Sequence, residues 1–341
     1  MGLGWIAEQL RLPTDQRLKL PPPSAISSDP ELMRELGGCI ADLYAQAHQE
    51  LPSELEQCSP IWLSNIATHL ARSKTLADAW PDDVSPPLLI KGSDLEQCVY
   101  PRFGLSVGAR SSTDWDLLLP HPEYGYLVQQ WANRYDPPTL PTSVRLTDEP
   151  SHELGFSIEG LLFEIHRDPA PRYACLLSGA ELWSRGIPIT LTEGLTVRHP
   201  SPLDRLWIWL THYAKSGGIT RLIDWLDFTF ILSDLEAGSS ALPTLALRFG
   251  LKSAFTEAMC RWSHSPLSIL IPSLDRWIKV RYQAPLDRFT FMNRLRHHAH
   301  IHEIRIAQLR LVPPPLRAQY LGRGVLHLLN PSPTKKAKED A

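Results

Sequence analysis

The sequence predicts an α+β fold in which a small mixed β-sheet region lies between two helical regions. Residues 30–75 carry apolar side chains at helical spacing, residues 86–199 alternate short apolar runs with turns, and helical patterns return after Pro200. Short strands between longer helices are typical of α+β proteins. We therefore expect an N-terminal helical segment at 1–80, a sheet core at 81–199, a C-terminal helical domain at 200–330 and a polar, disordered tail at 331–341.

Two helices are expected before the sheet. Asp29 is a favoured capping residue, and Pro30 follows it at the first helical position. Leu32, Leu36 and Ile40 then recur on one helical face. A second helix is predicted from Pro60 to about Thr75.

The central region contains six short apolar runs that we interpret as strands, because each is bounded by turn-forming residues. A helix from about 122 to 135 separates the second run from the third. The predicted strands are Leu88–Lys91, Trp115–Leu119, Ser143–Leu146, Gly155–Ile158, Leu161–His166 and Pro188–Val197.

The last region begins with a clear helix-start pattern. Ser201 can cap a helix, Pro202 suits its first position, and Asp204 adds negative charge to the first turn. Aromatic residues on the following helices are expected in the core rather than stacked on a base; they are Trp207, Trp209, Trp225 and Phe228. The predicted helices are 202–215, 218–234, 240–249, 251–263, 267–282 and 287–310.

Composition narrows the function classes. The chain has 341 residues and a net charge of −3, which argues against a dedicated nucleic-acid binder. Its five cysteines are scattered without a CxxC pair, so we expect reduced, buried thiols. No signal peptide and no membrane-spanning run is apparent, so we expect a cytoplasmic protein without a membrane partner. The histidines between His297 and His302 fit a solvated basic helix face better than a metal site.

Acidic residues at two predicted strands point to metal chemistry. Asp114 and Asp116 are two residues apart at the entry to an apolar strand, so their side chains share a face. Glu164 and His166 share a face of a later strand. A carboxylate in a buried strand is costly unless it is paired or metal-bound, although Glu164 on an edge strand facing water is an alternative. Three such carboxylates would suit Mg²⁺ or Mn²⁺ and a phosphoryl or nucleotidyl transfer.

The order of these motifs resembles the uncharacterised nucleotidyltransferase-like family of the DNA polymerase beta nucleotidyltransferase superfamily. The resemblance covers roughly residues 86–235 and departs from the family at Trp115, usually aliphatic, and at Trp225, one place late. The matching residues are Leu89-Ile90-Lys91-Gly92, Tyr100-Pro101, Arg110, Asp114-Trp115-Asp116, Glu164-Ile165-His166, His212, and Leu222 with Asp227.

The resemblance implies roles for individual residues. Asp114 and Asp116 would bind the metal, and Glu164 would be a third ligand or the base. Gly92 and Ser93 would begin a helix whose amide groups face the triphosphate. The other expected nucleotide-binding residues are Lys91, Arg110, His166, His212 and Lys215.

Simpler interpretations of some of these residues stay open. Lys91 would then only end a strand, Arg110 would pair with an acidic neighbour, and His166 and His212 would be structural.

The function that follows is transfer of a nucleoside monophosphate from an NTP to a hydroxyl or phosphate acceptor on a small molecule, peptide or protein. The expected partners are thus a nucleotide and an acceptor that the sequence does not identify, and a nucleic-acid acceptor is not favoured. The alternatives are a catalytically inactive nucleotide-binding or regulatory protein of the same fold, and a tRNA-modifying toxin-type nucleotidyltransferase. An intact set of three carboxylates favours the active enzyme over the inactive protein.

Overall fold

A computed structural model describes residues 2–12, 17–18, 24–27, 30–135, 153–170, 175–216, 218, 220–235 and 242–272. Several predicted features lie outside these residues. They are the Asp29 cap, the strand at 143–146, the His297–His302 cluster, the helix at 287–310, most of the helix at 267–282, and the tail at 331–341.

The described strands form one mixed six-stranded sheet in the order β3-β4-β2-β1-β6-β5. The central strands β2 and β4 are parallel, as are β1 and β6, whereas β1 and β2 are antiparallel and two hairpins form the sheet edges. The predicted α+β class is therefore confirmed. The strands are β1 (Leu88–Ile90), β2 (Asp114–Leu118), β3 (Glu153–Ile158), β4 (Leu161–His166), β5 (Ile187–Thr190) and β6 (Thr196–His199).

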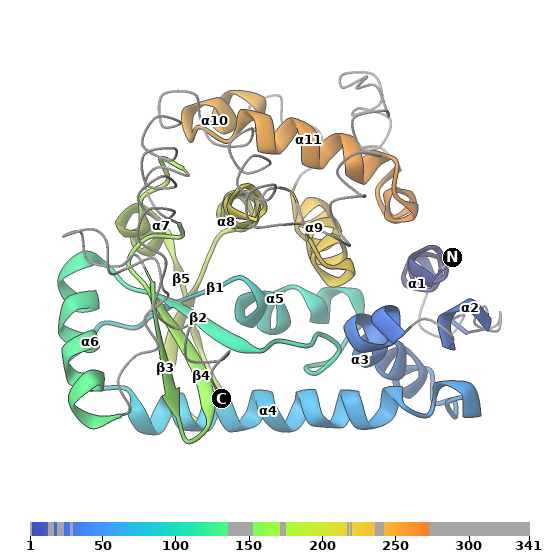
Figure 1. Ribbon diagram of the computed structural model, residues 1–341, viewed down its shortest axis with the longest axis horizontal. Helices are drawn as coiled ribbons and strands as arrows, with labels where there is room; N and C mark the ends of the chain where they lie inside the picture. The colour runs from blue at the N-terminus through green and yellow to red at the C-terminus, as the bar shows by residue number, and fades with distance from the viewer. Residues whose placement is uncertain are drawn as a thin grey trace, which may run out of the picture.

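Helices cover both sides of this sheet and extend beyond it (Figure 1). Before the sheet come α1 (Gly2–Arg11), α2 (Ser24–Ser27), α3 (Pro30–Gln46) and α4 (Cys58–Ala79). Between the strands lie α5 (Gly92–Cys98), α6 (His121–Arg134) and α7 (Gly179–Arg185). After the sheet come α8 (Pro202–Lys215), α9 (Leu222–Asp234), α10 (Leu242–Arg248) and α11 (Lys252–Ser263). Short 3₁₀ helices cover Ser53–Leu55, Tyr100–Phe103 and Pro266–Leu270.

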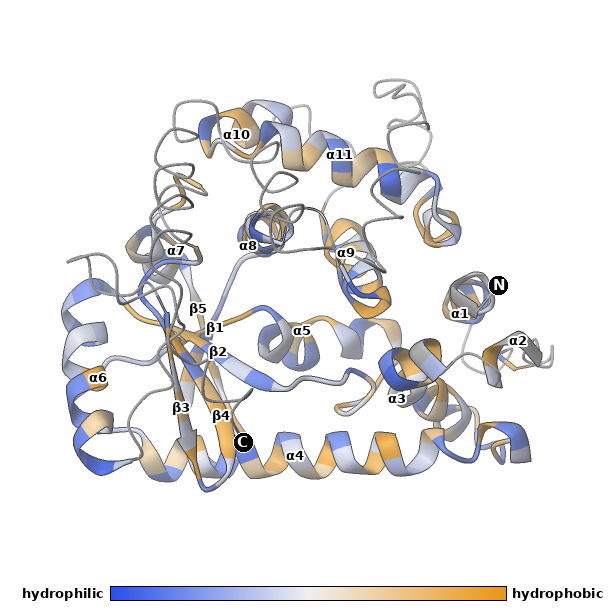
Figure 2. Ribbon diagram, in the orientation of Figure 1, coloured by the Kyte–Doolittle hydropathy of each residue, from blue (hydrophilic) through white to orange (hydrophobic). Residues whose placement is uncertain are grey.

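Two hydrophobic cores form because strand side chains alternate between the faces of the sheet. Leu89, Trp115 and Phe163 point to one face, where they pack with buried residues of α4 and α6. Ile90 and Leu118 point to the other face, where they join a larger core with α3, α5, α8 and α9. Figure 2 shows hydrophobic residues along much of β4, which is an inner strand. The carboxylates discussed below belong to the second face.

The helices that precede the sheet in the sequence contact the helices that follow it. Helix α3 packs against α9, and α1 packs against the 3₁₀ helix at Pro266–Leu270. One core therefore includes residues from Trp5 to Ile271. Among the described residues, no helix is both long and apolar enough to cross a membrane.

The single strand predicted at 188–197 is wrong, because the structure has two strands there. The chain turns between β5 and β6, which pair antiparallel. Gly194 has a φ of 84°, a left-handed conformation that glycine adopts without the cost of a Cβ atom. The amide of Leu191 donates to the carbonyl of Leu195 at 2.9 Å and closes the hairpin.

Other local expectations agree with the structure. The Ser201 hydroxyl accepts a hydrogen bond from the Asp204 amide and caps α8. All five cysteines are unbridged and all but Cys98 are buried, as expected for reduced thiols. One predicted boundary differs: helix α9 begins at Leu222 rather than at residue 218.

Candidate metal and nucleotide site

Pairing of β2 with β4 brings the predicted carboxylates together. The two strands are parallel, and Asp116 lies directly opposite Glu164. Asp114 lies two residues earlier on the same face of β2. Strand β4 lies between β3 and β2, so Glu164 is not an edge-strand residue; its side chain is 30% exposed toward the face that carries the aspartates. Alternation along β2 and the pairing of β2 with β4 together place these carboxylates on one face of the sheet.

These carboxylates line a pocket of about 650 Å³ between the sheet and the helices α3, α5, α8 and α9. Charged side chains predominate in its wall, and the apolar side chains there are Leu95, Pro200, Ile208, Trp209 and Ile231. The predicted site residues that line it are Lys91, Gly92, Arg110, Asp114, Asp116, Glu164, His212 and Lys215.

Asp116 is buried and held from two sides. His166 Nε2 lies 2.8 Å from its Oδ1, and the Lys91 ammonium forms an ion pair with the same oxygen. Burial alone would raise the pKa of Asp116, but Lys91 and His166 outweigh it and hold that pKa below its usual range. Asp116 is therefore an ionised carboxylate in a fixed orientation.

His166 connects Asp116 to a further carboxylate. The imidazole is fully buried, with Nδ1 3.7 Å from an oxygen of Glu153, its register partner on β3. The Lys215 ammonium of α8 donates to both oxygens of Glu153 at 2.8 Å. Burial and Lys91 lower the pKa of His166, but Asp116 and Glu164 raise it further, so its net shift is upward. A chain of polar contacts thus runs from α8 through the sheet to Asp116.

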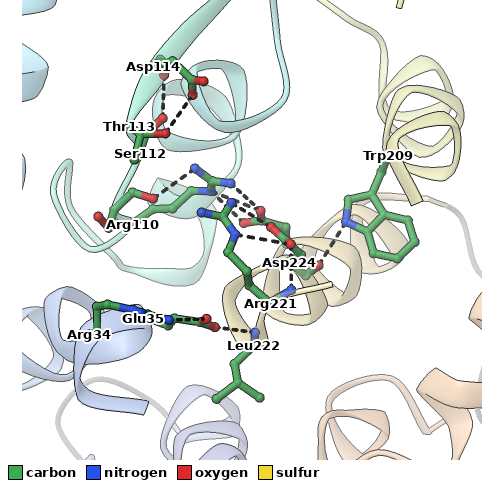
Figure 3. Close-up of polar contacts among 12 residues, drawn as sticks. Arg34, Glu35, Arg110, Ser112, Thr113, Asp114, Trp209, Arg221, Leu222 and Asp224 are labelled. Atoms are coloured by element: carbon green, nitrogen blue, oxygen red, sulfur yellow. Dashed lines mark hydrogen bonds and ion pairs between the residues drawn. The ribbon is translucent and has the colours of Figure 1, made fainter. Parts of the chain in front are cut away.

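Asp114 is the more accessible aspartate at the pocket edge. Burial, Asp116 and Glu164 all raise the pKa of its carboxyl group. Its backbone carbonyl accepts from the Ser112 hydroxyl at 2.6 Å, and its Oδ1 lies 3.3 Å from the Thr113 hydroxyl (Figure 3). A carboxyl group repelled by two other carboxylates is stabilised when a cation binds beside it.

The donor set fits a hard divalent cation. Asp116, Glu164 and His166 offer ligand atoms that all lie within 4.8 Å of one another, and Asp114 is not in that group. His166 Nε2 is already within hydrogen-bond distance of Asp116, so it serves better as a support for this ligand than as a ligand itself. Carboxylate oxygens are what Mg²⁺ and Mn²⁺ prefer, and Asp116 and Glu164 provide them.

Two carboxylates that line the pocket lack an ion-pair partner of the lysine or arginine type among the described residues. Each arginine or lysine that lines it forms an ion pair with a carboxylate, whereas Asp114 and Glu164 have no such partner among the described residues. Among the described residues, the basic side chain in ion-pair range of Glu164 is the His166 imidazole, with Nε2 at 3.5 Å. The pairs are Arg34–Glu35, Lys91–Asp116, Arg110–Asp227, Arg205–Asp94, Lys215–Glu153 and Arg221–Asp224.

Arg110 lines the pocket but is committed to a buried ion pair. Its Nη2 donates to Asp227 Oδ2 at 2.8 Å, and its Nε lies 3.1 Å from both Asp227 oxygens. The Tyr100 hydroxyl also donates to Asp227, at 2.8 Å. The alternative considered for Arg110, a pair with an acidic neighbour, is therefore what the structure shows. Its contact with a phosphate remains a prediction.

Gly92 makes room for this arginine. A Cβ atom at position 92 would overlap the Arg110 guanidinium, so any other residue there would force this buried, ion-paired side chain to move. The prediction that a helix starts at Gly92 is confirmed. Glycine there serves the packing of Arg110 as well as any close approach of a ligand to the backbone.

Two predicted nucleotide-binding side chains do not line the pocket. The Ser93 hydroxyl donates to the Ile90 carbonyl at 3.1 Å and is buried. His166 is fully buried, with Nε2 at Asp116. Their positions favour support of the turn and of Asp116 over direct contact with a nucleotide.

Some pocket residues were not anticipated from the sequence. Glu153 was missed because the predicted strand began at Gly155, two residues late. Arg221 and Asp224 form a capping box at the start of α9, and Glu35 accepts from the Leu222 amide at 2.5 Å (Figure 3). Trp209 donates its indole N–H to the Asp224 carbonyl at 3.0 Å and lines the pocket although it is 7% exposed.

Comparisons with known proteins leave the chain without a family assignment. No protein-family model matches it, and no curated protein matches it. A solved structure with some similarity is the crystal structure of the Megavirus polyadenylate synthase, at 11% identity and a TM-score of 0.32. The match covers 57% of this chain and 39% of that chain, so this chain spans less than half the length of the viral protein.

Proposed function

We propose that this protein is a metal-dependent nucleotidyltransferase that moves a nucleoside monophosphate from an NTP to a hydroxyl or phosphate acceptor and releases pyrophosphate. The observation that carries the proposal is the pair of carboxylates, Asp114 and Glu164, that flank Asp116 in the pocket without a lysine or arginine partner among the described residues. Their two surplus negative charges match one divalent cation. Both carboxylates line the pocket, so their oxygens are accessible to a cation that enters it.

The residues of the chain have distinct proposed tasks. Asp116, with Asp114 and Glu164, would hold Mg²⁺ or Mn²⁺. Such an ion neutralises phosphate charge and lowers the pKa of an attacking hydroxyl. His166 and Lys91 fix the orientation of Asp116. Glu164, whose side chain is 30% exposed, would act either as the third ligand or as the base that accepts the proton of an acceptor hydroxyl.

The rest of the pocket would hold the nucleotide. Helix α5 begins at Gly92, which lines the pocket, and the proposal assigns the backbone amides near Gly92 to phosphate oxygens. His212 and Lys215 of α8 also line this pocket. Each lysine and arginine of the pocket wall already forms an ion pair with a carboxylate. A bound metal would therefore have to neutralise much of the triphosphate charge.

Label transfer tests this proposal. The protein is incubated with each NTP labelled at the α-phosphate, Mg²⁺ and a cell extract, and labelled products and pyrophosphate are measured. We expect Mg²⁺-dependent transfer from at least one NTP and its loss, by more than a hundredfold, in the double variant Asp114→Asn, Asp116→Asn.

The matched control is Asp78→Asn, an exposed carboxylate on α4 with 67% side-chain exposure. It should retain wild-type transfer. Equal transfer by the Asp114→Asn, Asp116→Asn variant would reject the proposal. Nucleotide binding without any transfer would instead favour the inactive regulatory protein.

A further inference from the structure

Lys91 occupies an unusual backbone conformation at the end of β1. Its φ is 58° and its ψ is −130°, a region that residues with a Cβ atom rarely adopt. A glycine would take this conformation without strain, and the chain places its glycine one residue later, at Gly92. Strained residues of this kind persist where the surrounding structure over-determines them, commonly at functional sites. The lysine side chain must therefore contribute something that glycine would not.

The strained turn carries the Lys91 ammonium to Asp116. Lys91 Nζ forms an ion pair with Asp116 Oδ1, and the two side chains are 20% and 5% exposed. The ammonium thus lies among the same carboxylates that would hold a metal ion.

The charges of the carboxylates around Asp116 indicate a role for the Lys91 ammonium. Asp114, Asp116 and Glu164 contribute three negative charges, and Lys91 offsets one of them; with the His166 imidazole neutral, two remain, which equals the charge of one divalent cation. We propose that Lys91 is the resident cation of this site, and that its ammonium holds the position on Asp116 that a second divalent ion would otherwise take. This inference rests on the metal site proposed above and specifies how many ions that site accepts.

Two simpler roles for Lys91 do not explain both its strained backbone and its ion pair with Asp116. A lysine that only ends a strand does not explain why a strained backbone is retained at a position next to a glycine. A lysine that waits for a phosphate would be expected to point into open solvent in the pocket, but this ammonium is engaged with Asp116. A resident cation explains both the strain and the ion pair.

Counting bound Mn²⁺ tests the inference without any measurement of activity. Equilibrium dialysis is done on the full chain without nucleotide, because nucleotide phosphates bind Mn²⁺ themselves. We expect one Mn²⁺ per chain in the wild type and two in Lys91→Met. Lys91→Gly should also bind two, and it relieves the backbone strain, so it reports even if the methionine variant fails to fold.

The matched control is Arg34→Met. It removes one positive charge from the same pocket, but Arg34 is 75% exposed and pairs with Glu35 rather than with Asp116. It should bind one Mn²⁺. That result would show that the number of bound ions depends on where the Lys91 charge lies and not on the net charge of the pocket.

The outcomes separate this inference from the proposed function. The same number of ions in the wild type and in both Lys91 variants would overturn the resident-cation role and leave the metal site standing. Two ions in the wild type would do the same. No bound ion in any protein would remove the metal site and this inference together.

Discussion

Individual residues in the pocket show which expectations a sequence can support. Asp114 shares a face with Asp116, and Glu164 with His166, because strand side chains alternate, a rule that depends only on spacing. That Asp116 lies opposite Glu164 depends in addition on the pairing register of β2 and β4. The pairing of Arg110 with Asp227 joins residues 117 positions apart, and no local pattern specifies that contact. The same is true of Glu153 beside His166, since the pairing register of β3 and β4 decides it. The carboxylates were therefore predictable, and their supporting partners were not.

Gly92 is the residue for which a small change should matter most for packing. Gly92→Ala should lower the free energy of unfolding by about 1–3 kcal/mol, because the new methyl group overlaps the Arg110 guanidinium. Gly125→Ala in α6 is the control, since no atom lies within 4 Å of a Cβ there; it should be neutral or stabilise by up to about 1 kcal/mol. Urea unfolding measures both. Equal midpoints for wild type and Gly92→Ala would contradict the packing role.

His212 should make stability depend on pH. Burial, then Lys91 and Lys215, lower the pKa of its imidazole to about 4, and its Nδ1 has no hydrogen-bond partner among the described residues. The unfolded chain would take up this proton near pH 6.5 and the folded chain only near pH 4. The free energy of unfolding should therefore fall as pH falls through this window, by about 2 kcal/mol from this group.

The variant His212→Gln isolates that contribution, because other groups titrate in the same range. Urea unfolding is followed at pH 7, 6, 5 and 4.5 for both proteins. The loss of stability on acidification should be smaller in His212→Gln. An identical pH dependence in the two proteins would show that the imidazole does not stay neutral in the fold.

At the scale of elements, buried ion pairs join the sheet region to the C-terminal helices. Arg110, just before β2, pairs with Asp227 of α9, and Arg205 of α8 pairs with Asp94 of α5 at 2.6 Å. Most elements themselves followed from apolar periodicity and start signals such as Ser201. The β5–β6 hairpin did not, because its turn depends on the backbone conformation of Gly194.

Arg110→Met should destabilise the protein by about 3–5 kcal/mol, because it leaves Asp227 buried and unpaired with a cation. The double variant Arg110→Met, Asp227→Leu should recover most of that loss, since it removes both charges. Urea unfolding of the two single variants and the double variant forms a double-mutant cycle. Strictly additive losses would show that the two side chains do not stabilise each other.

At the scale of the whole molecule, the sequence indicated separate helical regions but not that they meet. Helices α1 and α3 contact the C-terminal helices, and one core spans from Trp5 to Ile271. Contacts between distant segments depend on tertiary packing that local patterns do not encode. The pocket results from this packing, because residues of α3, α5, α8 and α9 all line it.

The central claim is that carboxylates of β2 and β4 hold a divalent cation beside a nucleotide. Anomalous diffraction from crystals soaked with Mn²⁺ and a non-hydrolysable NTP tests it most directly. We predict a peak within about 2.5 Å of carboxylate oxygens of Asp116 and Glu164. A peak only at the second possible ligand group, Asp94, Cys98 and His199, or a nucleotide in the pocket without any peak at Asp116, would contradict the claim.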